Sequence, residues 1–123
     1  MSDPNRAHLS IDACLGQLPT PPAEQYLEFF LHGTLTLGLY APRGTDPQAP
    51  HTRDEVYVVV RGSGVFVHGD RTRPFAPGDL LFVPAHATHR FEDFTDDLAV
   101  WVMFYGPEGG ERVVESRPTE SRK

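Results

Sequence analysis

The chain has 123 residues, a formal net charge of −6 and a single cysteine. This length is typical of one domain with one core, and a single cysteine excludes a secreted fold held together by internal disulfides. The chain carries no basic cluster, no signal-peptide pattern and no apolar run of about 18 residues, so we expect a cytoplasmic protein that binds neither nucleic acids nor membranes.

Residues 1–25 are expected to form an N-terminal extension. Within it, residues 11–18 can form one or two helical turns, with Ser10 or Asp12 as the N-cap. Three prolines between residues 19 and 22 then favour an extended crossing. We interpret Cys14 as an apolar filler, because no activating partner stands beside it in the sequence.

Short apolar runs follow from residue 26 to residue 105, separated by turn signals from a chain with twelve prolines and eleven glycines. Such spacing is typical of many short strands joined by tight turns. We expect strands at residues 26–31, 35–41, 55–61, 65–68, 80–83, 89–94 and 98–105. This pattern predicts an all-β barrel or sandwich. The polar stretch 106–123 is expected to be a flexible tail.

The run from Val56 to Val60 is apolar on both faces of its predicted strand. A strand of this kind is buried on both sides, so something must cover the face that does not point into the barrel. Residues 26–31 could fold back over it, or a second subunit could cover it. We favour a homodimer, because Trp101 and Phe104 offer further apolar area.

The segment 44–62 reads G-T-D-P-Q-A-P-H-T-R-D-E-V-Y-V-V-V-R-G. It resembles the first motif of the cupin superfamily, in which a glycine precedes His-x-His, a glutamate and a second glycine. Glu55, the six residues after it and Gly62 match that motif, and His51 stands at the position of its second histidine. The segment departs from the motif at Ala49, which occupies the first histidine position, and its loop is one residue short.

The segment 78–93 reads G-D-L-L-F-V-P-A-H-A-T-H-R-F-E-D and resembles the second cupin motif. The matching residues are Gly78, Pro84 and His89. The departures are His86 in place of a glycine and Asp93 in place of an asparagine.

Fifteen residues separate the two motifs, which is a typical short microbial spacing for this family. The resemblance covers residues 35–105 and implies a double-stranded β-helix, or jelly-roll barrel, over residues 26–105. It also implies one divalent metal ion held by His51, Glu55 and His89.

The chemistry of these side chains suits a metal. His51 and Glu55 are four residues apart, an even step, so both side chains can face one side of an extended strand. Two imidazoles and one carboxylate suit a first-row ion such as iron, manganese, nickel or zinc, and suit magnesium or calcium poorly. Three protein ligands would leave open positions, as in catalytic sites.

Two further ligands are possible. Gln48 adjoins the missing histidine, and the shortened loop could swing it inward; His86 is expected to serve the backbone instead, since histidine tolerates positive φ. The alternatives without a metal are a hydrogen-bonded pair of histidines and, for Glu55, a salt bridge with Arg53 or Arg90.

An apolar pocket beside the metal could be lined by Tyr57, Phe66, Phe82, Phe91 and Trp101. For each of these side chains a plain core position is the alternative. Arg53 or Arg90 could pair with a carboxylate substrate, or could simply be solvated.

The pattern favours a metal-dependent enzyme on a small organic molecule, of dioxygenase, isomerase or decarboxylase type. No acid or base catalyst is identified in the sequence. The alternatives are a cupin that binds or senses a sugar-like ligand without catalysis, and a metal-free dimeric scaffold. The sequence shows no helix-turn-helix segment, which disfavours a DNA-binding regulator.

Overall fold

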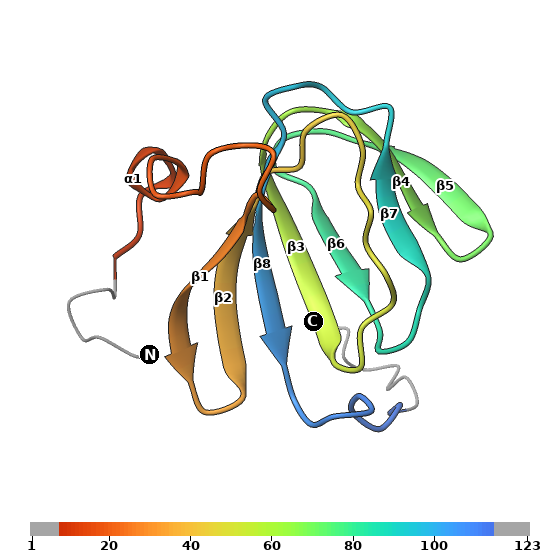
Figure 1. Ribbon diagram of the computed structural model, residues 1–123. Helices are drawn as coiled ribbons and strands as arrows, with labels where there is room; N and C mark the ends of the chain where they lie inside the picture. The colour runs from red at the N-terminus through yellow and green to blue at the C-terminus, as the bar shows by residue number, and fades with distance from the viewer. Residues whose placement is uncertain (1–7, 115–123) are drawn as a thin grey trace.

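The computed structural model describes residues 8–114 as one short helix and two antiparallel sheets (Figure 1). The elements in chain order are α1 (Ile11–Leu15), β1 (Tyr26–His32), β2 (Leu35–Tyr40), β3 (Asp54–Arg61), β4 (Gly64–His68), β5 (Arg71–Phe75), β6 (Leu80–Val83), β7 (His89–Glu92) and β8 (Ala99–Tyr105). The larger sheet has the order β1-β2-β8-β3-β6 and the smaller sheet the order β5-β4-β7. The prediction of an all-β barrel is therefore confirmed.

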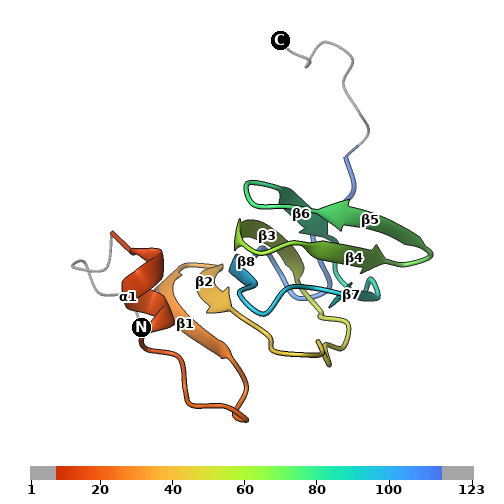
Figure 2. The ribbon, with the colours of Figure 1, turned by 90° about the horizontal axis from the view of Figure 1, so that it is seen from above.

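The main core lies between the two sheets, which face each other in the view from above (Figure 2). It contains Tyr40, Tyr57, Val59, Phe66, Phe75, Val83, Phe91, Leu98, Val100 and Val102. Alternate residues of β3 point into this core, so Tyr57 and Val59 are 0% and 1% exposed whereas Val58 between them is only half-buried. This period of two is that of a strand with one face on a core.

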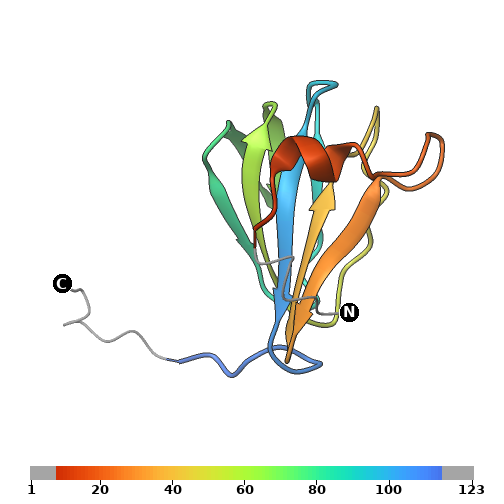
Figure 3. The same cartoon turned by 90° about the vertical axis from the view of Figure 1, so that its left-hand side faces the viewer.

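A second apolar cluster covers the outer side of β1, β2 and β8. Cys14 of α1 packs there with Phe29, Leu39 and Ala99, and Trp101 adds to the same cluster. Figure 3 shows α1 lying across this side of the larger sheet. The helix begins as expected at Ser10, whose side chain accepts a hydrogen bond from the Ala13 amide at 3.2 Å. Cys14 is 2% exposed, as an apolar filler should be.

For the outer face of β3 and β6, we expected either residues 26–31 or a second subunit as the cover. β1 cannot fold over it, because β2 and β8 lie between β1 and β3 in the sheet. Val56 and Val58 are half-buried on this face, beside Phe82 and Leu80 of β6, which are 46% and 64% exposed. Within the described chain the face is thus only partly covered.

Two other expectations need correction. Sequence patterning missed β5, whose residues Arg71–Pro74 are all exposed. The segment after β8 was expected to be flexible, yet the amides of Gly109 and Glu111 donate to the Thr52 carbonyl and to Asp54 Oδ2, at 2.6 and 2.8 Å. The remainder of the predicted tail, residues 115–123, lies outside the described residues. Among the described residues no helix is long and apolar enough to cross a membrane.

Asp54 fixes this returning segment at the start of β3. Its Oδ1 accepts a hydrogen bond from the Ala85 amide at 2.9 Å, while its Oδ2 accepts from the Glu111 amide. Asp54 is 5% exposed, so one buried carboxylate joins β3, the loop after β6 and the segment after β8. Both carboxylate oxygens are satisfied, as burial requires.

Candidate metal centre

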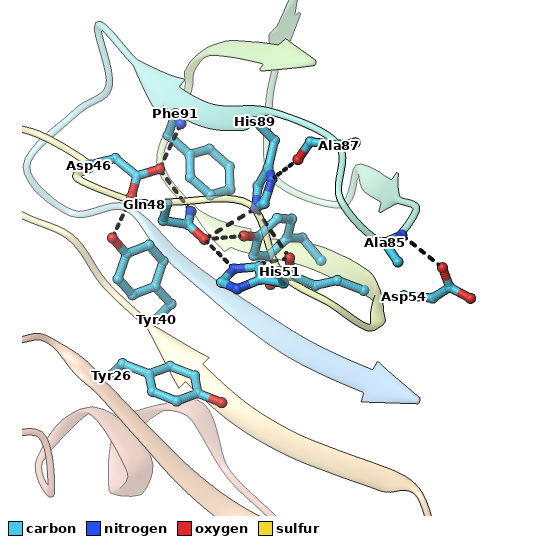
Figure 4. A network of polar contacts seen from close by, with 12 residues as sticks. Tyr26, Tyr40, Asp46, Gln48, His51, Asp54, Ala85, Ala87, His89 and Phe91 are labelled. Carbon is cyan, nitrogen blue, oxygen red and sulfur yellow. Dashed lines mark hydrogen bonds and ion pairs between the residues drawn. The ribbon is translucent and has the colours of Figure 1, made fainter. Parts of the chain in front are cut away.

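The fold brings His51, Glu55 and His89 together. Figure 4 shows the side chains of His51 and His89 close to each other, with ring centroids 5.1 Å apart. Glu55 lies on β3 of the larger sheet, His51 precedes β3, and His89 opens β7 of the smaller sheet. One ligand atom from each lies within 4.8 Å of the other two. Glu55 Oε1 is 3.2 Å from His89 Nε2 and 3.7 Å from His51 Nε2. The side chains of Glu55 and His89 are 1% and 0% exposed, and that of His51 is 34% exposed.

The backbone, rather than strand parity, positions His51. We expected His51 and Glu55 to share an extended strand. β3 begins only at Asp54, so His51 lies outside the strand that carries Glu55. Instead, the amide of His86 donates to the His51 carbonyl at 2.6 Å. His86 has φ of 71°, which confirms its expected role in the backbone, and its ring is not among the clustered ligand atoms. His86 therefore holds one motif against the other through its main chain.

The protonation of His89 leaves a lone pair pointing into the cluster. Its Nδ1 lies 2.9 Å from the Ala87 carbonyl, which can only accept a hydrogen bond, so Nδ1 carries a proton. In a neutral ring Nε2 then presents a lone pair to Glu55. Burial lowers the pKa of His89, but its contacts with Glu55 and with the Ala87 carbonyl raise it by more, so the pKa lies above its ordinary value. A positive charge at Nε2 is therefore favoured, supplied by a proton or a metal ion.

Glu55 gives the second sign of a cation site. Its Oε1 is buried and has no hydrogen-bond partner among the described residues, although His89 Nε2 is near. Buried carboxylate oxygens are costly unless they are paired or coordinate a metal. With metal–ligand bonds of 2.0–2.2 Å, neighbouring donors lie about 3.0 Å apart in octahedral and about 3.4 Å apart in tetrahedral coordination. The separations of 3.2 and 3.7 Å are close to these values, so the three residues fit a metal ion.

A polar network adjoins His51, Glu55 and His89, and at its centre is Gln48, which was considered from the sequence as a further ligand. Gln48 Oε1 lies 3.2 Å from His51 Nε2 and 3.3 Å from His89 Nε2, and it accepts a hydrogen bond from the Tyr57 hydroxyl at 2.8 Å. Gln48 Nε2 in turn donates to Asp46 Oδ2 at 2.8 Å. Asp46 is buried, which is unusual for an acidic residue in a loop rich in glycine and proline. Such a loop position is normally exposed, and for this reason no sequence pattern pointed to it.

A cavity of about 290 Å³ opens beside the cluster. Of the five residues predicted to line an apolar pocket, only Tyr57 lines it. Phe66 and Phe91 are in the main core, at 6% and 1% exposure. Phe82 points to the outer face of β6, and Trp101 packs in the cluster beneath α1. Strand parity explains these corrections, because Phe82 and Trp101 pair with Val56 and Val58, on the face of β3 opposite to Glu55.

The cavity wall is acidic and aromatic. Besides Tyr57, His51 and Glu55, it contains Glu24, Tyr26, Glu28, Tyr40, Gln48, Val102 and Phe104. The ring of Phe104 stands edge-on to His51 at 5.1 Å, so Phe104 belongs to the cavity and not to an outer apolar face. Gly38 makes room for the wall, since a Cβ there would lie 2.8 Å from Tyr26 Cε1.

Neither arginine considered in the sequence lines this cavity or pairs with Glu55. Arg53 donates to the carbonyls of Gly106 and Thr34, and Arg90 forms an ion pair with Glu92 on the surface. Of the alternatives considered for these arginines, the structure therefore favours a surface role over a contact with Glu55.

Comparison with known proteins agrees with this architecture. A family model described as "Cupin domain" matches residues 36–105, more than half of the chain. The uncharacterized protein SCO3923 of Streptomyces coelicolor is 41% identical over 85 residues, which cover 68% of this chain and 81% of that protein. The crystal structure of TT1209 from Thermus thermophilus is similar with a TM-score of 0.63 and 23% identity, covering 80% of this chain and 98% of that one.

A cupin-2 domain containing protein from Shewanella frigidimarina is likewise similar in fold, with a TM-score of 0.63 and 12% identity over 80% of this chain and 94% of that one. The fold, the two partial motifs and the family match lead to one conclusion. The chain belongs to the cupin family.

Proposed function

We propose that this cupin is a metal-dependent enzyme that acts on a small organic molecule, with one divalent first-row ion held by His51, Glu55 and His89. The observation that carries the proposal is the buried Glu55 Oε1, which lies 3.2 Å from His89 Nε2 and has no hydrogen-bond partner among the described residues, beside an open cavity. When bound, such an ion acts as a Lewis acid or activates oxygen. Three protein ligands leave positions for water or substrate, as catalytic sites do.

The cavity wall indicates the kind of molecule that would fit. The hydroxyls of Tyr26, Tyr40 and Tyr57 already donate to Glu28, Asp46 and Gln48. Burial raises the pKa of Tyr40 and of Tyr57, so both hydroxyls stay protonated and engaged.

The wall therefore offers acceptors to a ligand rather than donors. Glu24 and Glu28 are exposed at the cavity, and among residues 8–114 no lysine or arginine lines it. A substrate with hydroxyl or ammonium groups complements these carboxylates, whereas a dicarboxylate would be repelled. We propose an amino alcohol or a polyhydroxylated molecule as the substrate class, and oxidation or isomerisation as the type of reaction.

The experiment that tests this function compares the wild-type protein with His89→Ala. Elemental analysis after purification without chelators should find close to one first-row ion per wild-type chain and none in the variant. Oxygen consumption or product formation with amino alcohols and polyols should then be seen only in the metal-bearing protein, and dicarboxylates should give neither. A wild-type protein that takes up no ion from a metal-replete medium would overturn the proposal.

Substrate charge is tested at the cavity mouth. Glu28→Gln should weaken the use of ammonium-bearing substrates, and Asp70→Asn, which removes the same charge from a turn that does not line the cavity, should not. Equal kinetics of wild type and Glu28→Gln toward cationic and neutral substrates would contradict the assignment of the acidic wall to substrate binding.

Binding without turnover is the second candidate function. It is favoured by the engagement of all three cavity tyrosines, which leaves no unoccupied hydroxyl among them to transfer a proton. In that case a polyol would raise the thermal stability of the metal-loaded protein without being consumed.

We also propose that a second copy of the chain covers the apolar outer face of β3 and β6. The exposed side chains there are Leu80 and Phe82, next to the half-buried Val56 and Val58. Phe82→Glu should then shift sedimentation from dimer to monomer, whereas Val113→Glu, at a position that is 95% exposed, should not. A wild-type protein that sediments as a monomer at high concentration would refute this dimer and would leave a monomeric enzyme.

A further inference from the structure

We propose that Gln48 is a fourth protein ligand of the metal, and that Asp46 is the positioning residue that turns the Gln48 amide oxygen toward the ion. This inference rests on the proposed metal site and adds a Gln–Asp pair to it. The juxtaposition is visible in Figure 4, where the Gln48 side chain lies between Asp46 and the two histidines.

The position of Gln48 Oε1 is that of a ligand atom. It lies 3.2 and 3.3 Å from the Nε2 atoms of His51 and His89, the same spacing as the 3.2 Å between His89 Nε2 and Glu55 Oε1. Donor atoms bound to one first-row ion are separated by about 3.0 to 3.4 Å, given bonds of about 2.1 Å. Gln48 Oε1 thus extends the cluster of three donors to four with consistent spacing.

The surroundings of His89 Nε2 show the same convergence. The other ring nitrogen, Nδ1, is turned away to the Ala87 carbonyl at 2.9 Å. Two oxygens, from Gln48 and Glu55, lie 3.3 and 3.2 Å from Nε2. Three atoms that can bind a metal therefore converge on one point, and a metal ion at that point would contact all of them.

Asp46 determines which end of the amide faces the cluster. An ionised carboxylate only accepts hydrogen bonds, so the Gln48 amide must present its NH₂ group to Asp46 Oδ2 and its oxygen to the histidines. The Tyr57 hydroxyl, 2.8 Å from Oε1, supports the same orientation by donating to it. The orientation of the Gln48 amide is therefore fixed by Asp46 at its nitrogen and by Tyr57 at its oxygen.

Asp46 is itself held rigidly. Its Oδ2 also accepts from the Phe91 amide at 2.8 Å, and its Oδ1 accepts from the Tyr40 hydroxyl. At 7% exposure it has little freedom to turn away. Its negative charge polarises the Gln48 amide and raises the electron density on Oε1, as carboxylates do for metal-bound histidines. The oxygen is in place before the ion binds, so little conformational entropy is lost on binding.

This arrangement accounts for the departure from the first cupin motif. Ala49 stands at the position of the first histidine, and it is exposed, whereas Gln48 is half-buried and directed at the cluster. With the loop one residue shorter than in the motif, Gln48, the chain neighbour of Ala49, is the residue that faces the cluster. An amide oxygen is a harder donor than an imidazole nitrogen, which favours iron or manganese over zinc at this site.

Titration of the metal-free protein with Mn²⁺ tests the pair. Asp46→Asn should weaken Mn²⁺ binding about 10- to 100-fold, the usual effect of removing an outer partner of a ligand. Gln48→Leu should weaken it at least as much. The relaxivity of water protons by bound Mn²⁺ should rise in Gln48→Leu, because a water molecule replaces the lost protein ligand.

Tyr40→Phe is the matched control. It removes another hydrogen bond of Asp46 but leaves the bond between Asp46 and Gln48 intact, so its affinity for Mn²⁺ should fall less than that of Asp46→Asn. Near-UV circular dichroism establishes that each variant is folded. If either Asp46→Asn or Gln48→Leu fails to fold, the other variant still tests the pair.

The outcomes separate this inference from the proposed function. If the wild type binds Mn²⁺, His89→Ala does not, and Gln48→Leu binds it with wild-type affinity and relaxivity, the fourth ligand is refuted and the three-ligand enzyme stands. An affinity loss in Tyr40→Phe equal to that in Asp46→Asn would refute the orienting role of Asp46. A wild type that binds no Mn²⁺ or other first-row ion would overturn both proposals.

Discussion

Two hollows of the molecule differ more in the burial and hydrogen bonding of their side chains than in volume. The cavity beside His51 has a volume of about 290 Å³, and its polar groups are connected to the buried residues Asp46, Glu55 and His89. The other hollow, which we call the arginine groove, measures about 390 Å³ and is lined by Phe66, His68, Arg71, Arg73, Pro74, Asp79, Leu80, Leu81 and Phe82. The larger hollow has no buried polar network among the described residues that line it.

The position of the arginine groove in the fold explains its charges. Arg71 and Arg73 lie on β5, an edge strand of the smaller sheet, and both are exposed. Charged residues and proline on an edge strand prevent pairing with another sheet. A binding site therefore differs from a groove of this kind in the orientation and burial of its polar groups, and not in its volume.

An aromatic wall separates the two hollows, and breaking it should have the largest effect. Phe66 lines the groove, Tyr57 lines the cavity, and their rings contact edge to face at 5.9 Å. Phe91 packs on both, at 5.1 and 5.0 Å. Phe66→Ala should lower the free energy of unfolding in urea by about 3 to 5 kcal/mol, as large-to-small changes in cores do.

Phe82→Ala is the control for this measurement, because Phe82 lines the same groove but is 46% exposed. Its cost should be clearly smaller. Similar losses from the two substitutions would show that Phe66 does not form a packed wall.

Metal should stabilise the protein only through the cavity. At a metal concentration about 100 times the Kd, binding to the native state adds about 2.7 kcal/mol to the free energy of unfolding. We expect this increase in urea titrations of the wild type and its absence in His51→Ala, whose ring is one of the two imidazole donors. An undiminished increase in the variant would place the ion elsewhere.

The arginine groove should be the least sensitive region. The double variant Arg71→Ala/Arg73→Ala removes two exposed side chains that make no ion pair among the described residues. Surface changes of this kind alter stability by about 0.5 kcal/mol or less, and metal affinity should stay at the wild-type value. A weakened metal site in this variant would contradict the separation of the two hollows.

The sequence was sufficient to predict the fold and to single out the three residues that the structure brings together. Glycine and proline spacing indicated most strands, and two partial motifs indicated His51, Glu55 and His89, which the fold brings within 4.8 Å. β5 was missed because Arg-Thr-Arg-Pro shows no apolar alternation, and its strand character comes from pairing with β4.

The surroundings of the cluster could not be derived in the same way. Strand parity would have assigned Phe82 and Trp101 to the outer face, once the pairing of β6 and β8 with β3 was known. Burial of Asp46 depends on contacts with Phe91 and Tyr40, which are remote from it along the chain or in a different element. Tertiary contacts of this kind leave no periodic pattern in a sequence.

The Asp54 carboxylate has a practical consequence for the boundaries of the folded unit. The family match ends at residue 105, yet Asp54 binds the amide of Glu111 and is the chain neighbour of Glu55. Shortening the protein to the matched region would leave one buried oxygen of Asp54 without its donor, next to a proposed ligand. A reporter or affinity tag is therefore best joined after Glu111, where it would leave the hydrogen bond between the Glu111 amide and Asp54 intact.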